Sequence, residues 1–186
     1  MSISEIADPF EFTEENQMLA LESIKKYPDS RKQSAVMPIL DIAQRQNDGW
    51  LSQSAIEYVA DYLDMPYIRV WEIVTFYSMY YTKPVGKNFV QVCTTTPCWL
   101  RGSDNIVKAC KEMISPEQNI VSKSGLFSWM KVECLGACVN APLVQINDYF
   151  YEDLNYESTR NILQSLIDGK KIRSGSQTGR KGSKPE

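Results

Sequence analysis

The sequence lacks several groups on which common enzymes depend. Its 186 residues include no histidine, and this absence excludes Ser-His-Asp, Cys-His and histidine-based zinc catalysis. None of its cysteines has the C-x-x-C spacing that dithiol redox catalysis requires. It also contains no apolar run long enough to cross a bilayer, so we expect no direct membrane insertion. The chain therefore lacks the commonest general base and metal ligand of enzymes.

Basic residues are also scarce over most of the chain. The formal net charge is −3, but residues 170–186 hold six Lys or Arg and one acid, which leaves 14 basic and 22 acidic side chains elsewhere. Because phosphate backbones are bound by clustered Lys and Arg, the acidic body argues against nucleic acid as a partner. Residues 1–12 lack the basic and apolar regions of a signal peptide and are too acidic for a typical mitochondrial transit peptide, so we expect a cytoplasmic location.

Large apolar residues are almost absent from residues 170–186, which are rich in Gly, Ser and Lys. Such a segment cannot bury enough surface to order itself alone, so the composition predicts a basic flexible tail. A strand that docks on a partner is the alternative interpretation.

Apolar residues at helical spacing fill residues 1–82 and predict a bundle of four short helices. Cap residues mark the expected helix starts at Thr13, Ser30, Ser52 or Ser54, and Pro66. Pro38 is expected to kink the second helix. The run from Phe76 to Tyr81 is unusually aromatic and predicts a protein–protein surface if it is partly exposed. We therefore expect this region to serve partner docking.

Residues 83–169 mix the periods of strands and helices and predict a small α/β layer that follows a linker at Lys83–Gly86. The expected elements are a strand over 88–93, a helix capped by Ser103, a strand over 126–133, a hairpin over 143–151 and a helix over 155–167.

Two cysteine pairs follow the two expected strands. Cys93 and Cys98 have C-x4-C spacing, and Cys134 and Cys138 have C-x3-C spacing. A strand that delivers ligands onto a short loop fixes metal geometry well. If the two loops lie at the same sheet edge, each pair holds one iron of a [2Fe–2S] cluster, which takes four thiolates.

Zinc is the direct alternative, although structural zinc sites often use C-x2-C pairs and neither pair here has that spacing. The neighbouring residues also suit a buried cluster. Backbone N–H groups and hydroxyls of Thr94, Thr95 and Thr96 are expected to face sulfur, and Gly136 allows close approach. Ala137, beside Gly136, is also expected to lie next to the cluster. Spacing alone leaves both metals open.

Cys110 is expected to be a core residue and not a ligand. It shares one helical face with Ile106, Val107, Met113 and Ile114. Five cysteines without a signal peptide also make a disulfide framework a poor interpretation.

With these motifs in place, the sequence resembles the NuoE family, the small [2Fe–2S] subunit of the NADH dehydrogenase module of respiratory complex I. The resemblance covers about residues 12–169. It is carried by QVCTTTPC at 91–98 with LRGS at 100–103, by VECLGACVNAP at 132–142, by GWL at 49–51 and by VWEIVTFY at 70–77.

The resemblance implies an α+β chain, with a four-helix bundle at 1–82 and a thioredoxin-like α/β [2Fe–2S] ferredoxin domain at 83–169. One [2Fe–2S] cluster would be held by Cys93, Cys98, Cys134 and Cys138, whereas Cys110 matches no ligand position. The partners would be the flavin- and NADH-binding subunit and the adjacent iron–sulfur subunit. The chain would then belong to an oxidoreductase in the peripheral arm, at the cytoplasmic side of the bacterial inner membrane.

The same signature occurs in soluble NAD-linked hydrogenases and formate dehydrogenases, so a diaphorase subunit of such an enzyme is the first alternative. A zinc-stabilised adaptor without a redox role is the second. In the main interpretation, NADH oxidation belongs to the flavin of the partner, and this chain has no NADH or quinone site of its own.

Overall fold

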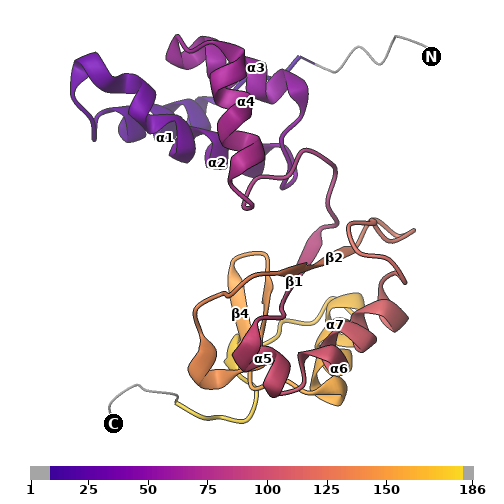
Figure 1. Cartoon of the computed structure of the whole chain (residues 1–186). Coiled ribbons are helices and arrows are strands. Elements are labelled where there is room, and N and C mark those ends of the chain that lie inside the picture. Colours follow the sequence, from indigo (N-terminus) through magenta and orange to yellow (C-terminus); the bar gives the residue numbers. More distant parts are fainter. Residues whose placement is uncertain (1–8, 182–186) are drawn as a thin grey trace. The chain divides into compact units, whose positions relative to one another are not determined.

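The structure is a computed structural model that describes residues 9–181 and divides into two compact units, Met1–Pro84 and Val85–Glu186 (Figure 1). The parts of the helical prediction at 1–8 and of the tail prediction at 182–186 lie outside the described residues. Within residues 9–181, no helix combines the length and the apolar character needed to cross a bilayer.

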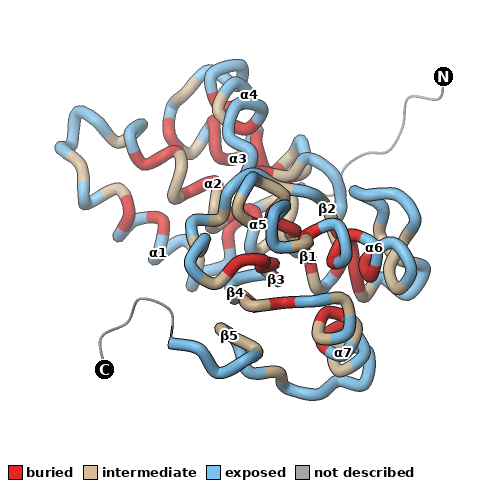
Figure 2. The backbone as a smooth tube through the Cα atoms, turned by 60° about the horizontal axis from the view of Figure 1, so that its bottom comes forward, coloured by how far each residue is buried: buried red, intermediate tan, exposed pale blue. Residues whose placement is uncertain are grey.

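The first unit contains four α-helices and one 3-10 helix within its described residues. They are α1 (Glu14–Ile24), η1 (Asp29–Ala35), α2 (Val36–Gln46), α3 (Gln53–Leu63) and α4 (Tyr67–Phe76). Their apolar faces meet in one core, in which Ile39, Leu40, Ile56, Leu63 and Val70 are fully buried. Figure 2 shows the buried stretches alternating with exposed ones along these helices, as amphipathic helices require.

Two of the expected caps are present in this unit, and one is wrong. The side-chain oxygens of Thr13 and Ser52 accept hydrogen bonds from the backbone at the starts of α1 and α3. Ser30 caps no α-helix, because it lies inside η1 and α2 begins only at Val36. Pro38 is consequently the third residue of α2, where its missing N–H loses no intrahelical bond, so it suits the helix start and does not interrupt the helix.

The second unit is built on a five-stranded sheet with strand order β2-β1-β3-β4-β5. Its strands are β1 (Asn88–Cys93), β2 (Phe127–Val132), β3 (Val144–Ile146), β4 (Tyr149–Glu152) and β5 (Gly175–Ser176). Its helices are α5 (Thr96–Leu100), α6 (Ser103–Met113), η2 (Cys138–Asn140) and α7 (Tyr156–Ile167). The expected strands, hairpin and closing helix are therefore present, whereas α5 and β5 were not predicted.

One face of this sheet is covered by α6 and α7, which pack against each other (Figure 1). β1 and β2 are parallel and joined through α6, while β3 runs antiparallel to both β1 and β4. The register places Val90 beside Trp129 on one side and Ile146 on the other, and all three are buried in the core under the helices. Since side chains alternate along a strand, Cys93 at the end of β1 belongs to the opposite face.

The start of α6 differs from the sequence prediction. Gly102 occupies the cap position with φ +92°, and Ser103 is the first helical residue. The Ser103 hydroxyl is buried and has no hydrogen-bond partner among the described residues. A left-handed backbone at Gly102 turns the chain into the helix, so the expected serine cap is not used.

The second unit begins with a close backbone contact at Gly86. Its N–H donates to the Ser128 hydroxyl at 2.9 Å, and a Cβ built on Gly86 would lie 2.1 Å from the carbonyl carbon of Phe127. Only glycine fits this approach to β2.

Part of the segment for which composition predicts a flexible tail makes defined contacts within the second unit. Residues 175–180, which we call the strap, pair with β4 through β5 and end at Arg180, which forms an ion pair with Asp153 at 2.6 Å. The physical reason is that the Asp153 side chain is only 7% exposed and its charge needs a partner. Local composition does not reveal that demand, because it arises 27 residues earlier in the chain.

Candidate metal centre

The first cysteine pair lies in what we call the first cysteine segment (residues 93–98). Cys93 is the last residue of β1, and Cys98 lies within α5, which begins at Thr96, so only Thr94 and Thr95 form the expected loop. Both thiols are buried, with exposed fractions of 1% and 0%. The strand and the short helix therefore hold this pair at fixed positions inside the unit.

The second pair lies in the second cysteine loop (residues 134–142), which follows β2. Cys134 and Cys138 are exposed, and their sulfur atoms lie 3.5 Å apart. Two thiolates on one tetrahedral metal ion lie about 3.8 Å apart for a metal–sulfur bond of about 2.3 Å. This pair consequently has nearly the spacing that a shared iron or zinc requires.

Backbone hydrogen bonds bring the two segments together. The N–H of Leu135 donates to the Cys93 sulfur, and the N–H of Leu143 donates to the Cys98 sulfur. The Cys93 N–H in turn donates to the Leu143 carbonyl at 3.3 Å. Cys93 and Cys98 also share a small apolar cluster with Leu135 and Leu143. The two cysteine pairs thus meet at the same end of β1.

The buried thiols have different pKa values. Burial alone would raise the pKa of Cys93, but hydrogen bonds from Thr95 and from the Leu135 N–H outweigh it and lower this pKa. Burial raises the pKa of Cys98 to about 12, and its hydrogen bond with Cys93 acts in the same direction. In the metal-free pair, Cys93 is therefore the thiol that ionises first.

Of the residues predicted to surround the cysteines, Thr95 and Gly136 contact a sulfur atom directly. The Thr95 hydroxyl lies 3.4 Å from the Cys93 sulfur, and the Gly136 N–H donates to the Cys134 sulfur at 3.4 Å with φ +88° at the glycine. Ala137 packs on the apolar cluster around the buried pair. The other two threonines have structural roles. The Thr94 N–H donates to the Val132 carbonyl, and Thr96 is the first residue of α5.

The donors from Leu135 and Leu143 could not be predicted from the sequence. Both act through backbone N–H groups, which every residue except proline carries, so the side-chain identity gives no signal. Only the pairing of β1 with β3 shows that Leu143 lies opposite the first cysteine segment.

Cys110 lies apart from this site. It is fully buried in α6, within the core between the helices and the sheet. Burial raises the pKa of its thiol to about 12, so it remains protonated at neutral pH. Its environment is that of a small apolar core residue.

The four remaining thiols fit an iron–sulfur cluster by their chemistry and their arrangement in pairs. Within residues 9–181, no three Cys, Asp or Glu side chains form a group that holds a single ion, so the fit rests on the two pairs. That all four are ligands stays a prediction of the sequence.

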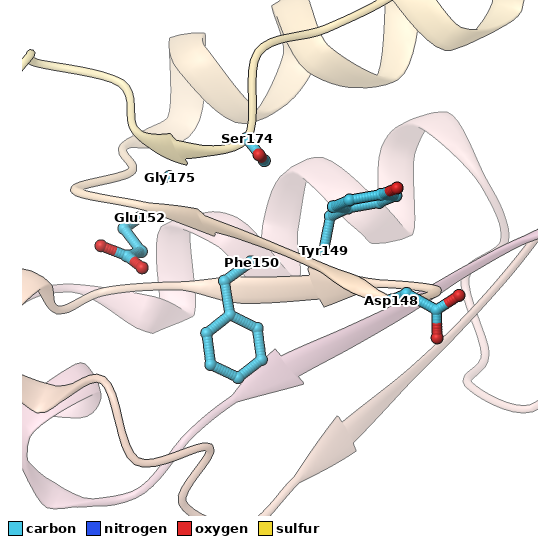
Figure 3. A pocket seen from close by; sticks show the side chains of 6 residues that line it. All are labelled: Asp148, Tyr149, Phe150, Glu152, Ser174 and Gly175. Carbon is cyan, nitrogen blue, oxygen red and sulfur yellow. The ribbon is translucent and has the colours of Figure 1, made fainter.

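A shallow pocket lies elsewhere in this unit, between β4 and the start of the strap. Figure 3 shows Asp148 and Glu152 at its two ends, with Tyr149 between them and Ser174 above. No cysteine lines it, and it is separate from the candidate metal centre.

The topology and the cysteine pairs match one known family. The family model of the thioredoxin-like [2Fe–2S] ferredoxins matches residues 20–167. The chain belongs to this family. The cofactor of this thioredoxin-like ferredoxin is accordingly one [2Fe–2S] cluster, and the fold is α+β with a mixed sheet.

Several curated proteins are similar to this ferredoxin over most of its length. The E subunit of the NADH-quinone oxidoreductase of Rickettsia bellii is 58% identical over 84% of this chain and 94% of its own length. NADH dehydrogenase [ubiquinone] flavoprotein 2 of Dictyostelium discoideum, a mitochondrial protein, is 46% identical over 93% of this chain and 70% of its own. These relatives confirm the resemblance to the NuoE family.

Among solved structures, an air-oxidised NAD⁺-reducing [NiFe]-hydrogenase is similar with a TM-score of 0.58 at 15% identity. The match covers 70% of this chain and 23% of the hydrogenase chain. At this identity the similarity concerns the fold alone.

Proposed function

We propose that this chain is the [2Fe–2S] electron-transfer subunit of the NADH dehydrogenase module of respiratory complex I. The observation that carries the proposal is the meeting of two cysteine pairs at the end of β1, in a family whose cofactor is this cluster. The 58% identity to the NADH-quinone oxidoreductase protein of Rickettsia bellii, over nearly the whole length of that protein, supports the host complex.

In this proposal Cys93, Cys98, Cys134 and Cys138 are the ligands. When bound, the cluster supplies one-electron exchange. The N–H groups of Leu135, Leu143 and Gly136 donate to three of the sulfur atoms, and such donors favour extra negative charge at the site. The burial of Cys93 and Cys98 keeps water from one side.

We assign the helical region, residues 1–82, to a four-helix docking bundle and residues 83–169 to the electron-transfer domain. The support is the exposed apolar surface at the end of α4, where Phe76 is 80% exposed and Tyr77 and Met79 are also exposed. The proposed partners are the flavin- and NADH-binding subunit and the adjacent iron–sulfur subunit. The proposed place is the peripheral arm, on the cytoplasmic side of the inner membrane.

Electron paramagnetic resonance of the dithionite-reduced protein, with iron and sulfide counted on the same sample, tests the cluster. We expect an S = 1/2 signal with two irons and two sulfides per chain, and its loss when Cys134 is replaced by alanine. A colourless protein without this signal that retains zinc after anaerobic preparation would refute the redox function and support the zinc adaptor.

Co-purification from cells tests the host and the docking role. We expect the full chain to purify with a flavin-containing subunit and with membrane subunits of a quinone reductase. A nickel–iron or molybdenum subunit in their place would establish the alternative host. Deletion of residues 1–81 should abolish assembly, and unchanged assembly would contradict the docking role.

A further inference from the structure

Five successive backbone carbonyls, those of residues 139–143, hold the end of the second cysteine loop and the residue that follows it. The carbonyls of residues 140, 142 and 143 accept from the N–H groups of Asp153, Leu154 and Cys93, at 2.8, 3.0 and 3.3 Å. The Ala141 carbonyl faces the Arg101 Nε at 3.5 Å. The carbonyl of Val139, directly after Cys138, accepts from Arg180 at 2.5 Å. Of these five donors, only Arg180 comes from the strap.

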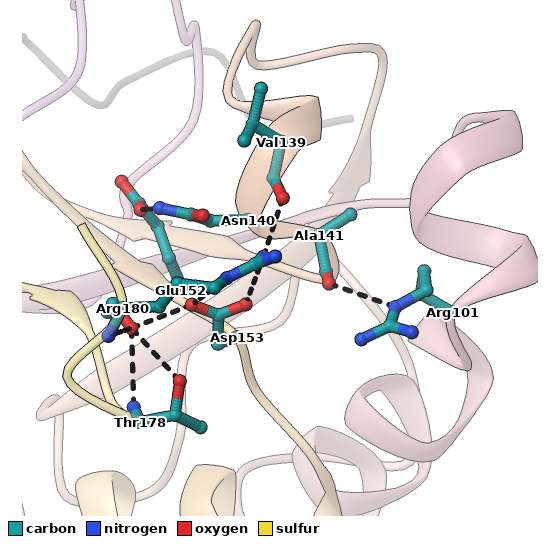
Figure 4. Close-up of polar contacts among 9 residues, drawn as sticks. Arg101, Val139, Asn140, Ala141, Glu152, Asp153, Thr178 and Arg180 are labelled. Atoms are coloured by element: carbon teal, nitrogen blue, oxygen red, sulfur yellow. Dashed lines mark hydrogen bonds and ion pairs between the residues drawn. The ribbon is translucent and has the colours of Figure 1, made fainter. Parts of the chain in front are cut away.

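Arg180 connects the loop with a nearly buried carboxylate. Figure 4 shows its guanidinium between Asp153 and the Val139 carbonyl. Its Nη2 lies 2.6 Å from Asp153 Oδ1 and its Nε 3.4 Å from Oδ2. Charge-assisted bonds of this kind are shorter and stronger than neutral ones. The backbone N–H of Asp153 also donates to the Asn140 carbonyl, so the two members of the ion pair contact two consecutive loop residues.

The strap itself is fixed by a compact set of hydrogen bonds. The Ser176 hydroxyl donates to Asp153 at 2.7 Å and accepts from the Arg180 N–H at 3.0 Å. The Gln177 N–H donates to the Glu152 carbonyl at 3.0 Å. These contacts place the Arg180 side chain without help from an apolar core. The strap is thus preorganised toward the loop.

The loop needs such support because its two cysteines are exposed and few apolar contacts hold it. Leu135 and Ala137 are its only members packed against the small apolar cluster beside the buried pair, apart from Ala141. A ligand on a loop keeps its place only as well as the groups that fix the loop.

We propose that the strap fixes the second cysteine loop and that Arg180 is a positioning residue for Cys138. This inference rests on the assignment of Cys138 as a cluster ligand. Arg180 touches no sulfur in this arrangement and acts through the Val139 carbonyl. Asp153 holds the guanidinium in place, so the two residues act as one unit.

Removal of either partner should accelerate iron loss from the full-length chain. We expect Arg180→Ala and Asp153→Asn each to release iron to the chelator bathophenanthroline about tenfold faster, as the loss of a charge-assisted hydrogen bond predicts. The double variant should be no faster than the faster single variant, because both changes break one unit. Arg180→Lys keeps the charge but not the planar guanidinium, so its rate of iron release should lie between those of Arg180→Ala and the unchanged protein.

The reduction potential separates positioning at the cluster from a general structural role. Arg180→Ala leaves a carboxylate unbalanced and should lower the midpoint potential, whereas Asp153→Asn leaves a guanidinium unbalanced and should raise it. The matched control is Lys181→Ala, which removes the same charge from the neighbouring exposed residue and should change neither quantity. An Arg180→Ala protein indistinguishable from Lys181→Ala would overturn the proposal.

Hydrogen exchange completes the test independently of the cluster. In Arg180→Ala we expect faster exchange at residues 134–143 and unchanged exchange in α6. Faster exchange throughout the second unit would show general destabilisation and refute the positioning role. If the unchanged protein binds no iron, the ligand assignment fails, and the exchange result still decides whether the strap fixes the loop.

Discussion

At the scale of single residues, the five thiols of this chain have three different environments. Cys93 and Cys98 are buried and receive hydrogen bonds, Cys134 and Cys138 are exposed, and Cys110 lies in an apolar core. Residue type alone therefore does not define a ligand. Position relative to the strand ends separates the four paired thiols from the fifth.

Replacement of Cys110 by serine should leave the cluster intact and weaken the fold. A hydroxyl at this fully buried position has no place reserved for a partner, so we expect a loss of about 1–2 kcal/mol in the free energy of unfolding. Iron content and the paramagnetic signal should be unchanged, and urea unfolding should show the loss. Absence of iron in a folded Cys110→Ser protein would show that the ligand assignment is wrong.

Asp153 should make the stability of the metal-free chain depend on acid pH. Burial alone would raise the pKa of its carboxyl, but hydrogen bonds from Ser176 and Arg180 and the Arg180 charge lower it below its usual value near 3.8. Because the folded pKa is the lower one, this contribution is complete above about pH 4 and is lost as pH falls through the folded pKa.

The measurement is urea unfolding of the unchanged protein and of Asp153→Asn between pH 7 and pH 3. We expect a stability advantage for aspartate of about 1–2 kcal/mol at pH 7, from a charge-assisted pair that is partly exposed at the arginine. The advantage should shrink only at the acid end. An advantage that stays constant down to pH 3 would contradict the lowered pKa.

At the scale of elements, Gly86 fixes how the chain enters the sheet. Replacement by alanine places a methyl group 2.1 Å from the Phe127 carbonyl carbon, so the backbones must part. We expect a loss of about 2–3 kcal/mol, measured as a lowered melting temperature. Gly125→Ala is the control: nothing lies within 4 Å, and φ +71° leaves only conformational strain, about 1 kcal/mol. Equal effects at both glycines would contradict the steric argument.

The elements that could be predicted are those with a regular apolar pattern and a side-chain cap. Thr13 and Ser52 precede α1 and α3, and both accept the expected backbone hydrogen bond. The predictions at Ser30 and Ser103 were wrong, because a cap motif describes local options and the surrounding backbone selects among them. α5 and β5 have five and two residues, too few for any periodicity to appear.

At the scale of the whole molecule, all four paired cysteines lie in the second unit, and each unit has its own core. Removal of iron should therefore loosen the second unit selectively. In hydrogen exchange with and without chelator, we expect faster exchange at residues 134–143 and at the end of β1, and unchanged exchange in α2 and α3. Equal acceleration in both units would show that they unfold together.

The family and the cofactor could be predicted from the resemblance of the motifs at 91–103 and 132–142, and the two-part organisation of the secondary structure from apolar periodicity. The geometry of the site could not, because it depends on contacts between Cys93 and Leu135 and between Cys98 and Leu143, which lie more than 40 residues apart. The strap was missed for the same reason. Its order comes from Asp153 and the free edge of β4, and neither is visible in the composition of residues 170–181.

The pairing of β5 with β4 has a consequence for self-association. β4 would otherwise be the last strand of the sheet, and an open strand edge invites pairing with another copy of the chain. Tyr151 and Glu152 are instead matched to Gly175 and Ser176, so the segment that supports the second cysteine loop also closes this edge. A chain that ended before residue 175 would present an unprotected edge and would be prone to edge-to-edge aggregation.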